Sequence, residues 1–114
     1  MATYTVTKVT VRPNTSIAWS WDNAAYRGGM DDITVMTFTI NLSDDELTHT
    51  SIQTWASKEE YLNLIVNKND AKWKTISGAT RTYMALNNFT STVTEEDGTV
   101  RIFNSSNKTY EVQE

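Results

Sequence analysis

The side chains best suited to chemistry occupy alternate positions between residues 49 and 55. His49, Ser51, Gln53 and Trp55 occur at every second position, so in an extended strand they lie on one face. His49 is the only histidine of the chain and the side chain expected to titrate near neutral pH. Because ligand sites place a few polar groups in apolar surroundings, these residues are candidates for lining a small-molecule pocket.

A plainer interpretation stands beside the pocket. His49 lies near the end of an expected hairpin, where solvent or backbone groups would satisfy its ring nitrogens. Trp55 immediately precedes an expected helix and would fill the corner between strand and helix as a structural residue. Arg12, Arg27 and Arg81 could each bind a carboxylate ligand, although surface arginines are common.

A hairpin is expected to position the candidate pocket. Residues 33–42 and 47–56 both read as strands, and the polar run 43–46 turns the chain between them. A symmetric hairpin sets Leu42 opposite Leu47, which places Phe38 on the same face as His49, Gln53 and Trp55. Phe38 therefore joins the candidate pocket. The other face of the hairpin is rich in threonine, and we expect it to meet water or a partner's sheet.

The helix after this hairpin has a clear start signal. Ser57 is a favourable N-cap, and Glu60 stands three residues later, as in a capping box. Ala56 and Tyr61 occupy the positions of a hydrophobic staple. A helix is therefore predicted from Lys58 to about Lys68.

The remaining elements complete a βαββαβ order with an extra hairpin. A strand is expected over 4–11, followed by a weak helix over 17–26. Another helix is expected after Asp70 and continues through Met84. Gly78 within that helix suggests a kink or a close helix approach. A terminal hairpin is expected over 92–103, and a short strand at 108–112. The turn of the hairpin is formed by Glu95, Glu96, Asp97 and Gly98. The carboxylates of its three acidic residues are expected to be solvated. This order predicts an α+β, ferredoxin-like antiparallel sheet with helices on one face, in a single domain over 1–114.

Composition excludes several classes of protein. The chain has 114 residues, no cysteine and one histidine, so neither a thiolate site nor the usual zinc ligand set can form, and we expect no cofactor. A net charge of −4 without a basic stripe argues against nucleic acid. No apolar run reaches the roughly 20 residues that span a membrane, and no signal peptide is visible, which favours the cytoplasm.

The run 52–61, IQTWASKEEY, resembles the W-x-S-x-E-x-[YF] junction of the dimeric α/β-barrel superfamily. That superfamily includes antibiotic-biosynthesis-monooxygenase-like proteins, and the run is also similar to uncharacterised dimeric ferredoxin-like proteins of marine environmental origin. The resemblance implies a homodimer with sheets packed face to face, and a cavity between each sheet and its helices. The heme-degrading members use an Asn on the first strand, a Trp, and a His on a later helix. Here the first expected strand has no Asn and no His follows His49, so only Trp55 matches a position of that set.

Two functions from different classes follow. The first is a dimeric, ferredoxin-like protein that binds a small molecule between sheet and helices. The second is a non-enzymatic structural or interaction protein, including one of viral origin. No nucleophile elbow, P-loop, dinucleotide-binding glycine pattern or HExxH motif occurs, so the sequence assigns no reaction.

Overall fold

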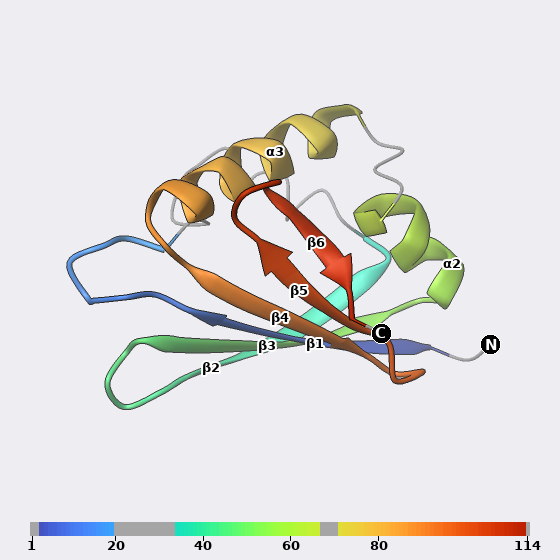
Figure 1. Ribbon diagram of the computed structural model, residues 1–114. Helices are drawn as coiled ribbons and strands as arrows, with labels where there is room; N and C mark the ends of the chain where they lie inside the picture. The colour runs from blue at the N-terminus through green and yellow to red at the C-terminus, as the bar shows by residue number, and fades with distance from the viewer. Residues whose placement is uncertain (1–2, 20–33, 67–70, 114) are drawn as a thin grey trace.

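The computed structural model describes residues 3–19, 34–66 and 71–113. Within them six strands form one antiparallel sheet, with the helices on one side of it (Figure 1). The strands are β1 Tyr4–Val11, β2 Met36–Leu42, β3 Thr48–Trp55, β4 Thr90–Glu95, β5 Val100–Asn104 and β6 Thr109–Val112. Their spatial order is β2-β3-β1-β4-β5-β6, so the first strand of the chain lies inside the sheet.

The sheet has two chemically different faces. Tyr4, Val6 and Thr10 of β1 are buried on the helix-covered face, whereas Val11 is exposed on the other. The pairing of β1 with both β3 and β4 is continuous. No bulge therefore interrupts β1, and Val6 and Val9, three positions apart, point to opposite faces.

The β2–β3 hairpin has the predicted faces but a different register. Leu42 lies opposite His49, not Leu47. The reason is the turn: Ser43 N–H donates to the Thr48 carbonyl at 2.9 Å, and Glu46 has φ of 59°. The Asp45 carboxylate accepts from both Ser43 Oγ and Leu47 N–H, which takes Leu47 out of the strand. A two-residue shift of register keeps every side chain on its predicted face.

The first helical segment begins where the sequence predicts. Ser57 Oγ accepts from the Glu60 N–H at 3.2 Å, which is the N-cap half of the predicted box. Helix α2, Lys58–Tyr61, continues as the π-helical segment η1, Leu62–Val66. Ala56 is exposed and Tyr61 is buried against Trp55, so the expected staple is replaced by an aromatic contact.

The long helix α3, Ala71–Leu86, ends before Asn88, which has φ of 60°. The helix therefore includes Met84, as predicted. Asp70, after which this helix was expected to begin, and nearly all of the expected helix over 17–26 lie outside the described residues. Figure 1 shows α2 and α3 on the same side of the sheet. No helix in the described ranges is long and apolar enough to span a membrane.

The fold class is thus confirmed at its coarser level: an α+β protein with a six-stranded antiparallel sheet and helices on one face. The order of strands is not that of a classic βαββαβ ferredoxin-like sheet, because β5 and β6 extend it beyond β4. The predicted terminal hairpin and short last strand correspond to β4, β5 and β6.

Two apolar clusters hold the helices to the sheet. The first joins β1, β3 and β4 to α2 through Tyr4, Val6, Trp55, Tyr61 and Val93. The second joins α3 to β5 and to the chain after β1 through Trp19, Met84, Phe89 and Phe103. Aromatic rings dominate both, and their edge contacts contribute beyond the buried area.

Gly78 lies inside α3, and the described residues give no packing reason for a glycine there. Among them a Cβ at this position would meet only the Arg81 Nη2, at 3.8 Å, which is an ordinary contact. Gly78→Ala should therefore raise the free energy of unfolding by roughly 0.5–1 kcal/mol, measured by urea denaturation. Ala79→Gly, at the adjacent exposed position, is the matched control and should lower it similarly. A less stable Gly78→Ala variant would show that the helix is closely approached here, as the sequence suggested.

Candidate functional site

The five predicted pocket residues share the helix-covered face. Trp55 is fully buried, and its ring centroid lies 5.5 Å from that of Tyr61 in an edge contact. Its indole Nε1–H donates to Gln53 Oε1 at 3.0 Å. The polar group of Gln53 therefore has an internal role, since it satisfies a donor that would otherwise be buried without a partner.

The other three residues lie progressively closer to solvent. Ser51 is buried. The His49 ring is half-buried, with its centroid 5.5 Å from that of Trp19. Phe38 is 46% exposed. The structure thus brings the five residues onto one face and in part explains their polarity by contacts within the chain. A ligand pocket among them stays a prediction.

Gln53→Leu tests the internal role of the amide. We expect the free energy of unfolding to fall by about 1–3 kcal/mol, because the Trp55 indole N–H loses its acceptor in a buried place. The measurement is chemical denaturation. The control is a double-mutant cycle with Trp55→Phe: in that background the same leucine should cost much less. Equal costs in both backgrounds would mean that the hydrogen bond contributes nothing.

Two of the arginines considered as ligand-binding groups use their donors internally. Buried Arg12 donates from Nε to the Glu46 carbonyl and from Nη1 to the Ile17 carbonyl, both at 2.9 Å. Its guanidinium carbon Cζ lies 4.4 Å from the centroid of the Trp19 ring. Arg81 donates to the carbonyls of Ser77 and Lys108. Arg27 lies outside the described residues.

The strongest polar cluster was not predicted. Glu95, expected to be a solvated turn residue, is the last residue of β4 and only 3% exposed. That expectation is wrong because Glu95 continues the alternation of Ser91 and Val93, both buried. The alternation is visible in the sequence, and reading it two residues further would have placed Glu95 on the helix-covered face.

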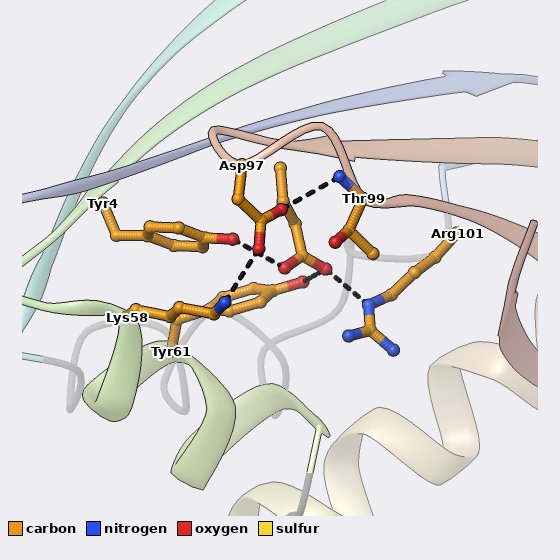
Figure 2. A network of polar contacts seen from close by, with 7 residues as sticks. Tyr4, Lys58, Tyr61, Asp97, Thr99 and Arg101 are labelled. Atoms are coloured by element: carbon orange, nitrogen blue, oxygen red, sulfur yellow. Dashed lines mark hydrogen bonds and ion pairs between the residues drawn. The ribbon is translucent and has the colours of Figure 1, made fainter.

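Three side chains from three elements donate to this carboxylate. Tyr4 Oη of β1 donates to Glu95 Oε1 at 2.9 Å, and Tyr61 Oη of α2 donates to Oε2 at 3.2 Å. Arg101 Nε of β5 donates to Oε2 at 2.5 Å and forms an ion pair with it. Figure 2 shows Tyr4, Tyr61 and Arg101 converging on one point between the sheet and α2. We call these four residues the Glu95 cluster.

A second carboxylate, that of Asp97, lies beside the Glu95 cluster (Figure 2). Asp97 Oδ2 pairs with Lys58 Nζ at 2.8 Å, and Asp97 Oδ1 accepts from the Thr99 N–H at 2.9 Å (Figure 2). The hydrogen bond from Lys58, followed by that from Thr99, holds the pKa of Asp97 well below its usual range. The pKa of Lys58 is raised by the same partner. This pair is exposed, so it contributes little to stability.

Both tyrosines of the Glu95 cluster hold their protons tightly. Burial, together with the neighbouring Glu95, raises the pKa of Tyr4 and of Tyr61 far above the ordinary tyrosine value. A tyrosine that serves as a base near neutral pH needs the opposite shift. The cluster is therefore built to donate hydrogen bonds to a fixed carboxylate, which is the arrangement of a structural clamp.

Neither a metal nor a known family assigns chemistry to these residues. In the described ranges no group of three or more His, Cys, Asp or Glu side chains could hold a metal ion. No protein-family model, curated protein or solved structure matches the chain. The resemblance to the dimeric α/β-barrel superfamily thus stays a prediction.

The raised tyrosine pKa values predict a particular alkaline titration. The chain has five tyrosines, and we expect two of them to ionise only at pH values well above about 10, where free tyrosine titrates. Unfolded tyrosines release protons near that pH while folded Tyr4 and Tyr61 keep theirs. The free energy of unfolding should therefore be unaffected by these groups below about pH 10 and fall as the pH rises further.

Ultraviolet absorbance of tyrosinate measures this titration. Tyr4→Phe and Tyr61→Phe should each remove one late-ionising group. The control is Tyr83→Phe, which should leave both late-ionising groups in place. In the wild-type protein the Tyr83 hydroxyl donates to the Ala18 carbonyl at an exposed site. Five tyrosines ionising together near pH 10 in the folded protein would contradict the prediction.

Proposed function

We propose that this chain is a non-enzymatic assembly protein whose folded unit associates with a second copy through the uncovered face of its sheet. The observation that supports this proposal is the composition of that face. We call it the open face: the side chains of β1–β6 that point away from α2 and α3. Threonine fills most of its positions, and Val9, Ile52 and Ile102 lie among them.

The open face carries almost no charge. The register places Thr7 between Ile52 and Thr94, and Thr92 between Val9 and Ile102. Across β1, β2, β3, β4 and β5 no charged side chain points to this side; Glu111 of β6, opposite Ile102, is the exception. Charged residues make up 21% of the chain, so their near absence from a whole face favours a surface that is covered in the assembled protein.

The size of the open face suits a dimer. Six strands spaced about 4.8 Å apart and about six residues long present roughly 600 Å². This area is of the same order as the roughly 800 Å² that a standard interface buries from each partner. A surface whose one charged strand residue is Glu111, on the edge strand β6, also meets its own copy with little like-charge repulsion.

The order of the first four strands supports the same proposal. β2-β3-β1-β4, with helical segments after β3, is compatible with a ferredoxin-like core to which the β5–β6 hairpin is added. We propose that two such cores stack sheet to sheet, as the resemblance to the dimeric α/β-barrel superfamily implies.

A single charge on the open face tests this function. Ile52 is 45% exposed at the middle of β3. Ile52→Lys should at least halve the mass of the assembly measured by light scattering after gel filtration. It should weaken association about a hundredfold or more, because a two-fold interface would bury two ammonium groups, each costing several kcal/mol.

The matched control is Leu86→Lys, the same kind of change on α3 at a residue 75% exposed. It should leave the mass unchanged. A wild-type protein that is monomeric at high micromolar concentration, or an Ile52→Lys variant with wild-type mass, would overturn the proposal. Circular dichroism of the variants confirms that they are folded.

A further inference from the structure

The two edges of the sheet are protected unequally. β6 is four residues long, follows Lys108 and contains Glu111, which are the usual devices against edge-to-edge pairing. β2 is seven residues long, and from Thr34 to Leu42 it carries no charge and no proline. Natural proteins rarely leave such an edge open.

Within residues 3–19, 34–66 and 71–113, β2 pairs with β3 alone, and the backbone groups on its outer edge belong to exposed apolar residues. Ala56 N–H donates to the Val35 carbonyl, and Ser43 N–H donates to the Thr48 carbonyl. In an antiparallel ladder the bonding direction alternates, so odd-numbered residues of β2 face β3, and even-numbered residues aim their N–H and C=O groups away from it. Phe38, Ile40 and Leu42 are even-numbered, and their side chains are 46%, 54% and 40% exposed.

We propose that β2 pairs antiparallel with β2 of a second copy, across a two-fold axis near Thr39. This contact is distinct from the open face: it joins two sheets edge to edge into a twelve-stranded one and leaves the open face uncovered. It therefore goes beyond the proposed function and does not depend on it. The partner of this edge is a second copy of the chain, because the residues of β2 are complementary to those of another β2.

The strand is complementary to its own copy in three respects. A two-fold axis at Thr39 sets Phe38 opposite Ile40 of the second copy and Met36 opposite Leu42 of the second copy, so apolar groups meet on one side and threonines on the other. The four outward-facing residues of each copy would exchange about eight backbone hydrogen bonds. No like charges approach, and a charged foreign peptide would find no ionic partner on β2.

The test is made in the Ile52→Lys protein, where open-face association is removed. There we expect a dimer by light scattering, and the added substitution Ile40→Lys should return a monomer. Leu86→Lys, added instead, should leave the dimer intact. Should Ile40→Lys fail to fold by circular dichroism, Phe38→Lys replaces it. A monomeric Ile52→Lys protein would overturn edge pairing, even where the wild-type protein associates through its open face.

Cysteine cross-linking identifies the contact directly, because the chain has no cysteine of its own. With the axis at Thr39, oxidation of Thr39→Cys should give a covalent dimer. Thr37→Cys should not, since residue 37 of the two copies would be about 13 Å apart along the strands. Cross-linking of Thr37→Cys or Asn41→Cys alone would support β2–β2 pairing with the two-fold axis at that residue instead of Thr39. Cross-linking only in mixtures of two different cysteine variants would also support the pairing, with the axis between the two residues. No covalent dimer from any single variant or mixture would overturn the proposal.

Discussion

The buried carboxylate of Glu95 is the constraint on which the rest of the structure depends. A charge at 3% exposure is tolerated only when donors replace the water that it has lost. Those donors come from Tyr4, Tyr61 and Arg101, so β1, α2 and β5 must all reach β4 at the same point. Apolar packing alone would allow these elements to slide, whereas a satisfied ionic cluster fixes their relative positions.

Much of the fold follows from local sequence patterns. The limits of β1, the Ser57 cap and the end of α3 are set by alternation, side-chain capping and an Asn in the left-handed region, all of which are local. The faces of the β2–β3 hairpin were predictable for the same reason. Its register was not, because the two hydrogen bonds to Asp45 that fix the turn are an alternative to the symmetric loop that residue types alone do not exclude.

The candidate site was harder to predict because polar residues on a buried face have two explanations. Gln53 was predicted to line a pocket, which stays a prediction, and its amide oxygen also accepts from Trp55 two residues away. Glu95 stood among carboxylates typical of a turn, and its partner Tyr4 is 91 residues distant. Contacts of this range come from the topology of the sheet, which no local pattern around Glu95 contains. The contrast between the two surfaces, by comparison, is predictable from the strands, because threonine occupies most outward positions and large apolar or aromatic side chains concentrate on the helix-facing positions.

The interior position of β1 has a consequence for how the chain folds during synthesis. β1 leaves the ribosome before its two partners, β3 and β4, and β4 begins only at Thr90. A nascent chain therefore carries a half-paired central strand until β4 has emerged, and pairing over such sequence separations is slow. During that interval the threonine-rich segment Tyr4–Val11 is open to chaperones, and its late capture by β4 is the expected rate-limiting event of folding.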